Sequence, residues 1–313
     1  MTRSVKVSHG TWPMIFGLDR PADLAQAAAV IAAFGYDGIE LAGFHGHATL
    51  ERFPDATSRH RLATDLDALG LRPVLIAPDP FDGAIAPGGA WVLTGDPQAL
   101  TVERRGWSAY LGFAEALGIG RMRIDNGTPG PLPYDAAYEQ VWERTVQLFR
   151  WLAERGAESG CEMVWEMESG QPFNKPSEIV RLLDDVDHPN LRLLYDTAHF
   201  HAATVLGHNQ VQPVEVCDGG QIELIRRLKG SIGHVHLCDT DGDVARNWFA
   251  SKLGFGKGLV DFEELLTALV DSYDGEWWGV DAIPMGSEVW ADCWDAVDFV
   301  RDVVGRHVAA VPA

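Results

Sequence analysis

The feature that most constrains the fold of this chain is a regular alternation of short apolar runs with longer amphipathic segments. The short runs are rich in apolar and β-branched residues, and in the segments between them apolar residues recur at helical spacing. We expect strands over residues 5–10, 38–43, 72–78, 121–127, 162–168, 191–196, 233–239 and 277–283. Helices are expected over residues 22–35, 55–70, 101–118, 134–160, 176–186, 221–230, 261–273 and 288–304.

This order of elements indicates the fold class. Strict alternation of strands and helices implies a parallel sheet with helical crossovers. Eight such units in 313 residues predict an α/β fold, a (β/α)8 TIM barrel that forms a single domain over residues 1–313. An open doubly wound sheet is the alternative, and it is disfavoured because no G-x-G-x-x-G motif follows the first strand.

Charge and cysteine content limit the partners and the compartment. Lys and Arg number 25 and Asp and Glu 45, which gives a formal net charge of −20. Such a chain is repelled by nucleic acids and anionic membranes, so we expect neither as a partner. The four cysteines form no C-x-x-C pair, the N-terminus carries no apolar signal segment, and no run of 18 apolar residues occurs. We therefore expect a soluble cytoplasmic protein.

Several expected strands end in residues that bind metals or transfer protons. The segment LLYDTAHFH (193–201) is one example, because an apolar run leads directly into an aspartate and a histidine. Closing a parallel barrel brings the carboxyl ends of all strands to one rim. The residues concerned are Glu166 and Glu168 on the fifth strand, Asp196 and His199 on the sixth, His234, His236 and Asp239 on the seventh, and Asp281 on the eighth.

A metal site is the functional interpretation of this pattern. His234 and His236 share a face of their strand, and the deeper His234 is expected to bond to backbone in the core, so His236 is favoured as the ligand. With Glu166, Asp196 and Asp281 it forms a hard donor set that suits one divalent ion, Mn²⁺ first and Mg²⁺ or Co²⁺ as alternatives. Such an ion polarises a carbonyl and stabilises an enediolate while a carboxylate transfers the proton. The structural alternative is that a lone acidic residue, such as Asp196, only caps a helix.

These motifs resemble those of the xylose isomerase-like barrels. The resemblance rests on E-x-E, FNKPSEI (173–179), LLYDTAHFH, GHVHLCD and WWGVDAI, and it covers nearly the whole chain. This superfamily of sugar-phosphate isomerases and epimerases includes ketose 3-epimerases, inosose dehydratase and AP endonucleases. The resemblance implies that Glu166 is a metal ligand and the base, that Asp196 and His236 are ligands, and that His199 contacts a substrate oxygen.

Two positions depart from the ketose epimerase pattern. Asp281 stands where those enzymes carry a glutamate that is the fourth ligand and second base. Because aspartate is one methylene shorter, epimerisation with two bases is weakened and one-base isomerisation or β-elimination gains support. The second departure is Gly242, which stands where they place a substrate-binding arginine; the nearest arginine here is Arg246.

Residues and resemblance together predict a metal-dependent isomerase or epimerase of a small carbohydrate or cyclitol. Its catalytic residues would be Glu166, His199 and Asp281. The alternative is a lyase on the same site, by inosose-type dehydration or by β-elimination of a 3-keto C-glycoside. An AP endonuclease is disfavoured by the net charge of −20, and a sugar-binding barrel without activity is disfavoured by the intact strand-end ligands.

Nine residues are candidates for substrate binding, and several of them have a purely structural alternative. A tryptophan can stack on a sugar or pack under a loop, a histidine can lie in the core, and a lysine before a helix can be exposed. The candidates are His9, Trp12, His47, Arg123, Glu168, Lys175, His199, Asp239 and Arg246. A homo-oligomer is possible, with Trp277, Trp278, Trp290 and Trp294 either at its interface or in the core.

Overall fold

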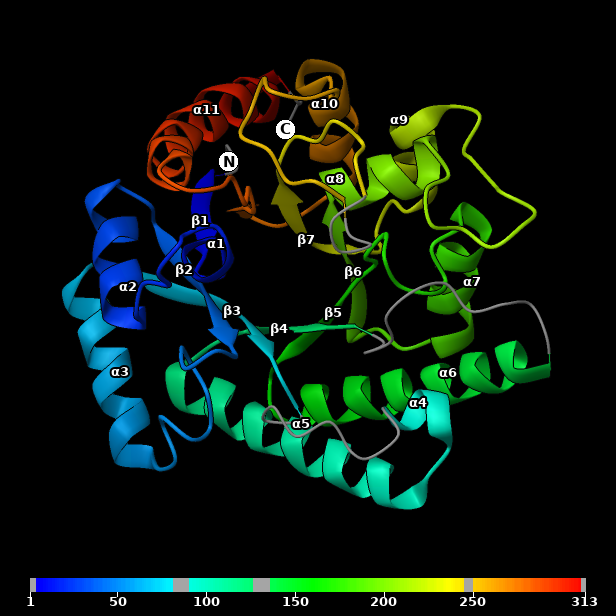
Figure 1. Cartoon of the computed structure of the whole chain (residues 1–313), viewed down its shortest axis with the longest axis horizontal. Helices are drawn as coiled ribbons and strands as arrows, with labels where there is room; N and C mark the ends of the chain where they lie inside the picture. The colour runs from blue at the N-terminus through cyan, green and yellow to red at the C-terminus, as the bar shows by residue number, and fades with distance from the viewer. Residues whose placement is uncertain (1–3, 81–89, 126–135, 245–249, 311–313) are drawn as a thin grey trace.

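Eight parallel strands close into a barrel in the computed structural model, which describes residues 4–80, 90–125, 136–244 and 250–310 (Figure 1). Neighbouring strands pair in sequence order, and the last strand pairs with the first. The predicted (β/α)8 barrel is therefore confirmed, and the open doubly wound sheet is excluded. The strands are β1 (Lys6–Gly10), β2 (Gly38–Gly43), β3 (Arg72–Pro78), β4 (Arg121–Ile124), β5 (Glu162–Glu166), β6 (Leu191–Asp196), β7 (Ile232–Leu237) and β8 (Trp277–Val280).

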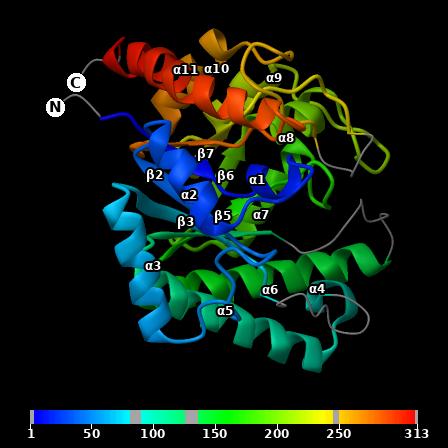
Figure 2. The same cartoon turned by 60° about the vertical axis from the view of Figure 1, so that its left-hand side comes forward.

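Helices surround the barrel on the outside, as Figures 1 and 2 show from two directions. The eight predicted helices correspond to α2 (Leu24–Ala33), α3 (Ala56–Ala68), α5 (Pro97–Leu117), α6 (Ala136–Glu158), α7 (Pro176–Val186), α9 (Gly220–Arg227), α10 (Phe262–Ser272) and α11 (Glu288–Ala310). Four short segments lie outside the eight predicted helices: α1 (Pro13–Phe16), α4 (Trp91–Thr94), α8 (Thr197–Phe200) and the π-helix η1 (His201–Val205). They are too short to give a periodic pattern.

Side-chain caps fix where several helices begin. Asp23 and Asp55 each accept a hydrogen bond from the backbone N–H three residues later, and each forms a capping box with that residue. Asp261 caps α10 without such a box, by accepting from the N–H of Glu264 at 3.1 Å. These contacts satisfy N–H groups that a helix start leaves without a partner.

The core has two layers because alternate residues of each strand face opposite sides. Outward-facing residues, such as Met163 and Trp165 on β5, belong to the large cluster between the strands and the helices. Val164, between them, belongs to a smaller cluster inside the barrel. Glu166 follows on the same inward face, so the interior changes from apolar to charged at the carboxyl end of the strand.

The exposure of the tryptophan and cysteine side chains bears on several smaller expectations. Trp277 and Trp278 are buried and belong to the core, whereas Trp294 is 56% exposed. All four cysteines are buried and free. Among the described residues, no helix is long and apolar enough to cross a membrane.

Candidate active site

Four side chains that could bind a metal converge at the carboxyl rim of the barrel. Glu166 ends β5, Asp196 ends β6, His236 lies on β7 and Asp281 directly follows β8. One ligand atom from each lies within 4.8 Å of those of the other three, and all four residues are buried. The structure thus brings together residues that are distant in sequence, because parallel strands of a barrel end at the same face. We call these four residues the ligand cluster.

The two carboxylate oxygens of Glu166 have different surroundings. Its Oε2 accepts from Nε of Arg123, which also donates to Glu168. Its Oε1 has no hydrogen-bond partner in the described part of the chain; it lies 3.4 Å from Nδ1 of His236 and 3.7 Å from Nζ of Lys252. Burial alone would raise the pKa of Glu166, but Arg123 and Lys252 outweigh burial and hold this pKa well below its usual range. Glu166 is therefore ionised.

Glu168 differs from Glu166 in its affinity for protons. It accepts hydrogen bonds from Arg123 and from the side chain of Gln171. Burial raises the pKa of Glu168, and the neighbouring Glu166 carboxylate adds to this rise, while Arg123 offsets only part of it. Two carboxylates whose pKa values are driven apart in this way are typical of acid–base pairs.

Asp196 uses one oxygen as a helix cap and the other in the ligand cluster. Its Oδ1 accepts from the backbone N–H of His199 at 2.8 Å, and this contact begins α8. Its Oδ2 lies 3.0 Å from Nζ of Lys252. The capping alternative is therefore correct, but it accounts for only one of the two oxygens. Burial, together with the Lys252 ammonium, lowers the pKa of the His199 imidazole to about 4. This ring is therefore neutral at pH 7.

His236 is oriented from beneath by Glu40 of β2. Its Nε2 lies 2.8 Å from Oε2 of Glu40, while its Nδ1 points into the ligand cluster, 3.3 Å from Oδ2 of Asp281. The other oxygen of Glu40 contacts Nε2 of His234 at 2.9 Å and accepts from Ser8 at 2.6 Å. A carboxylate that fixes the second nitrogen of a metal-binding histidine is a recurrent feature of metal sites.

The environment of His234 corrects one expectation. This histidine lies deeper in the barrel, as predicted, but its partner is the Glu40 carboxylate and not a backbone group. Gly279 on β8 leaves the space that the Glu40 and His236 side chains need. A Cβ atom at that position would lie 2.6 Å from Oε1 of Glu40 and 2.8 Å from Cδ2 of His236.

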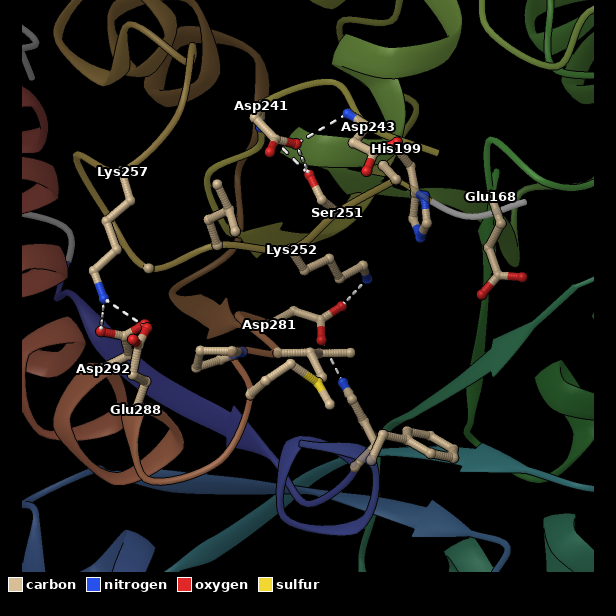
Figure 3. Close-up of a pocket in the computed structure, with 18 of the residues that line it drawn as sticks. Glu168, His199, Asp241, Asp243, Ser251, Lys252, Lys257, Asp281, Glu288 and Asp292 are labelled. Atoms are coloured by element: carbon tan, nitrogen blue, oxygen red, sulfur yellow. Dashed lines mark hydrogen bonds and ion pairs between the residues drawn. The ribbon is translucent and has the colours of Figure 1, made fainter. Parts of the chain in front are cut away.

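Lys252 places a positive charge inside the ligand cluster. Its ammonium donates to Oδ2 of Asp281, as Figure 3 shows, and also contacts Asp196 and Glu166. The other oxygen of Asp281 accepts from Nε1 of Trp12. Burial would lower the pKa of Lys252, but the three carboxylates outweigh it and raise this pKa well above its usual value. The lysine is therefore a buried cation paired with three anions.

The ligand cluster fits a divalent metal ion. Its donors are three carboxylates and one imidazole, which suit ions of the Mn²⁺ or Mg²⁺ type. Two of its buried donor atoms, Oε1 of Glu166 and Nδ1 of His236, have no hydrogen-bond partner among the described residues. The cluster also already surrounds a positive charge, that of Lys252. A divalent ion would replace this ammonium as the counter-charge of the carboxylates.

A cavity of about 1100 Å³ opens onto the ligand cluster. Glu166, Asp281 and Lys252 line it, whereas Asp196 and His236 are fully buried and do not. The predicted substrate contacts that line the cavity are Trp12, Arg123, Glu168 and His199. In Figure 3, His199 and Glu168 lie on the side of the cavity away from Lys257, Glu288 and Asp292, so the cavity extends well beyond the ligand cluster.

Other predicted substrate contacts are not among the described residues that line the cavity. His9 and His47 are buried, and each places a ring nitrogen within 2.9 Å of a backbone carbonyl. Lys175 is also buried, so the alternative of an exposed lysine is wrong; its ammonium donates to the carbonyl of Pro213. Asp239 accepts three backbone N–H groups and thereby holds the loop after β7. These side chains stabilise the fold around the site.

Arg246, the remaining candidate, lies outside the described residues. Two charged residues that contact the ligand cluster, Glu40 and Lys252, were not among the predicted site residues. Glu40 had a signal, because a carboxylate inside the apolar strand GIELAG is costly to bury unless it is paired. Lys252 had no such signal in the sequence, since a lysine in a glycine-rich loop is usually solvated. Its inward direction depends on the loop, which pairs Leu253 with Asp239 in an antiparallel bridge.

Comparisons with known proteins agree with this architecture. A family model described as a xylose isomerase-like TIM barrel matches residues 28–290. The chain is 27% identical over 158 residues to an inosose dehydratase of Geobacillus thermodenitrificans (strain NG80-2), a match that covers 46% of the chain and about half, 48%, of that relative. An inosose dehydratase of Clostridium botulinum (strain Alaska E43 / Type E3) is 24% identical over 304 residues, 90% of the chain and 91% of that relative.

Solved structures resemble the whole barrel. The IOLI protein, whose crystal structure contains a zinc atom, has a TM-score of 0.72 at 16% identity and covers 97% of this chain and 99% of its own. D-psicose 3-epimerase, crystallised in the presence of D-fructose, has a TM-score of 0.71 at 16% identity and covers 96% of this chain and 100% of its own. At such low identity these similarities establish the fold alone.

Proposed function

The chain belongs to the xylose isomerase-like TIM barrel family, and on this premise we propose that it is a divalent-metal-dependent isomerase or epimerase. Its substrate would be a sugar, keto-sugar or cyclitol. The reaction would move a proton at a carbon atom next to a carbonyl group. Relatives named inosose dehydratase and structural neighbours named 3-epimerase support this class of reaction.

The state of Glu166 is the observation that carries the proposal. This carboxylate is ionised, is held in place by Arg123 and lines the cavity. Its second oxygen has no hydrogen-bond partner in the described part of the chain. A fixed, ionised carboxylate at a cavity wall can remove a proton from a substrate carbon, and such general-base catalysis contributes roughly 10²- to 10⁴-fold.

Glu166, Asp196, His236 and Asp281 would hold the metal. When bound, the metal supplies Lewis-acid polarisation of a substrate carbonyl, which makes the adjacent C–H more acidic. Mn²⁺ is the first candidate, with Mg²⁺ and Co²⁺ as alternatives. Zn²⁺ belongs in the same test because the related IOLI structure contains zinc.

The other residues of the cavity would position the substrate and the base. His199 is neutral at pH 7 and lines the cavity, so it would exchange a hydrogen bond with a substrate oxygen. Glu168, with its raised proton affinity, would bind a second oxygen. Arg123 and Trp12 would act indirectly, because Arg123 holds Glu166 in place and Trp12 holds Asp281 in place.

The contacts of Asp281 favour a second candidate function. One of its oxygens accepts from Trp12 and the other from Lys252, whose ammonium a bound metal would replace, so both oxygens are engaged with or without metal. Epimerisation with two bases needs a second residue that reaches the opposite face of the substrate carbon, whereas elimination needs one base and a leaving group. A lyase on the same site is therefore the alternative, either by inosose-type dehydration or by β-elimination of a 3-keto C-glycoside. The relatives named inosose dehydratase support this alternative.

Solvent isotope exchange tests the shared first step of both reactions. The purified protein would be incubated in D₂O with Mn²⁺ and a panel of ketoses, inososes and 3-keto-glycosides, and the panel followed by proton NMR. Deuterium should enter at a carbon next to the carbonyl. A rearranged sugar as product would indicate the isomerase or epimerase, and an unsaturated product or released fragment would indicate the lyase.

Two variants serve as controls for this experiment. Glu166→Gln should abolish the exchange. Glu162→Gln, at the opposite end of the same strand, should preserve it, because Glu162 bonds to Arg121 and Arg192 and does not line the cavity. Exchange that survives in Glu166→Gln would refute the role of this residue. A complete lack of exchange across the panel with metal-loaded protein would contradict proton abstraction as the reaction.

A further inference from the structure

The cavity is larger than a free sugar needs. Its volume of about 1100 Å³ is slightly above the roughly 300–1,000 Å³ that accommodates drug-sized ligands. Figure 3 shows two separate groups of ion-paired residues along it, Lys252 with Asp281 in one and Lys257 with Glu288 and Asp292 in the other. A single sugar ring bound at Lys252 and Asp281 would leave much of this space without contacts.

An apolar wall runs along the cavity beside the ligand cluster. It consists of Phe16 from α1, Phe44 after β2, and Ile283, Pro284 and Met285 after β8. The rings of Phe16 and Phe44 stack at a centroid distance of 5.8 Å. Phe16 is 48% exposed and Met285 58% exposed, although both line a cavity. Exposed apolar surface that continues from a polar site is typical of a ligand-binding groove.

Backbone contacts hold this wall in position. The N–H of Gly286 donates to the carbonyl of Gly17 at 2.7 Å, which joins the loop after β8 to the end of α1. The N–H of Ile283 donates to the carbonyl of Lys252 at 2.9 Å, which joins the wall to the loop that carries Lys252. The wall is therefore already formed, and a bound apolar group would not need to order it.

The charges of the cavity disfavour an anionic ligand. Seven carboxylate side chains and three cationic ones line the part of it that the structure describes. Each cation already has an acidic partner: Arg123 contacts Glu166 and Glu168, Lys252 contacts Asp281, and Lys257 lies 2.6 Å from Asp292. Even with a divalent metal bound, the carboxylates would remain in excess. A phosphorylated or carboxylated substrate would therefore be repelled.

We propose that the substrate is an uncharged keto-sugar that carries an apolar substituent at least as large as an aromatic ring. This inference rests on the proposed function, which locates the reacting sugar carbon beside Glu166. The apolar substituent would lie against the wall formed by Phe16, Phe44 and Met285. Glycosides with an aromatic aglycone have this chemistry, whereas free ketoses, cyclitols and sugar phosphates do not.

Binding without turnover tests the inference. Three probes would be titrated into Mn²⁺-loaded protein and followed by saturation-transfer NMR: methyl β-glucoside, phenyl β-glucoside and glucose 6-phosphate. The phenyl glucoside should bind at least about tenfold more tightly than the methyl glucoside, as expected for burying an aromatic ring. The phosphate should bind no better than the methyl glucoside. Phenyl binding that is equal, weaker or undetectable would overturn the inference, and so would preferred binding of the phosphate.

Surface variants locate the binding of the aromatic group. Phe16→Ala and Met285→Ser should each bring the ratio of phenyl glucoside affinity to methyl glucoside affinity close to one. Trp294→Ala is the matched control, because Trp294, like Phe16, is an exposed aromatic residue that packs against a phenylalanine, but it does not line the cavity. A phenyl preference that both wall variants retain would show that the aromatic group binds elsewhere.

The outcome can be separated from that of the isotope exchange experiment. Exchange in free ketoses or inososes without any phenyl preference would overturn this inference and leave the proposed function standing. A phenyl preference that depends on Phe16, with no exchange in any keto-sugar, would instead refute the proposed reaction while the aromatic subsite stood.

Discussion

Glu40 and His236 meet inside the barrel, with Oε2 of the glutamate 2.8 Å from Nε2 of the histidine. Their strands, β2 and β7, are not neighbours in the sheet, so this contact crosses the interior. It fixes the orientation of the ring and directs Nδ1 toward Glu166 and Asp281. Burial would raise the pKa of Glu40, but the two histidines hold it well below its usual range, so the carboxylate is ionised.

Replacing Glu40 should weaken metal binding. Glu40→Gln keeps the shape of the side chain but removes the negative charge beside His236, and losses of such supporting partners typically lower metal affinity by roughly 10- to 100-fold. Calorimetric titration of the metal-free protein with Mn²⁺ measures the change. Glu276→Gln, at an exposed salt bridge with Lys6, is the control and should leave the affinity unchanged. An unaltered Kd in Glu40→Gln would contradict the role given to this contact.

Replacing Lys252 should strengthen metal binding. Lys252→Met removes the ammonium that competes for three carboxylates, and a unit charge about 4 Å away at intermediate dielectric is worth several kcal/mol, so we expect a rise of roughly 10- to 100-fold in affinity for Mn²⁺. Without metal, the variant should be less stable than the parent by roughly 3–5 kcal/mol, because buried carboxylates lose their partner.

Thermal unfolding with and without Mn²⁺ separates these two effects of Lys252→Met. Added metal should raise the Tm of the variant more than that of the parent protein. Lys257→Met is the matched control, since Lys257 pairs with Asp292 and Glu288 instead of the ligand cluster. A metal affinity that falls in Lys252→Met would mean that the lysine assists metal binding, contrary to this prediction.

Adding one methyl group at Gly279 should disturb the interior of the barrel. Gly279→Ala would place Cβ 2.6 Å from Oε1 of Glu40, and overpacking of this kind typically costs about 1–3 kcal/mol. Gly305→Ala in α11 is the control, because a Cβ atom there meets no atom within 4 Å and alanine favours helix. Urea unfolding should therefore show opposite changes in stability for the two variants. Equal stability of Gly279→Ala and the parent would contradict the close packing around Glu40.

Glu103 should make the protein less stable as the pH rises. Burial raises its pKa to about 7 in the folded protein, and the hydrogen bond from the N–H of Trp91 offsets only part of that rise. Because the folded pKa exceeds the unfolded value, the contribution of Glu103 is fully present below about pH 4.5 and is lost progressively up to about pH 7.

Glu103→Gln should therefore stabilise the protein at pH 8 by roughly 1–3 kcal/mol and have little effect at pH 4.5. Urea unfolding at several pH values measures this difference. Glu115→Gln, on the exposed side of the same helix, should show no such pH dependence. A difference between parent and Glu103→Gln that stays constant with pH would rule out the titration of Glu103 as the cause.

The sequence by itself determined the barrel and the positions of the ligand cluster. Helical and strand periodicities are local properties of the chain, so all eight strands and the eight long helices could be predicted from them. The ends of the strands are local as well, and barrel closure brings any parallel strand ends together. Glu166, Asp196, His236 and Asp281 could therefore be grouped without knowledge of the structure.

Only the tertiary structure decided which side chains contact one another across the barrel and from its loops. The pairing of Glu40 with His236 depends on which residues of two non-adjacent strands lie at the same depth, and no local pattern encodes that depth. The position of Lys252 depends on the path of a long loop, as does the alignment of Phe16 with Met285 along the cavity. His9 and Asp239 lie at strand ends, which is why the sequence suggests them as substrate contacts, and the structure adds that backbone groups from neighbouring residues and loops contact both. Local sequence sets where a side chain leaves the backbone, and the packing of distant segments sets what it meets.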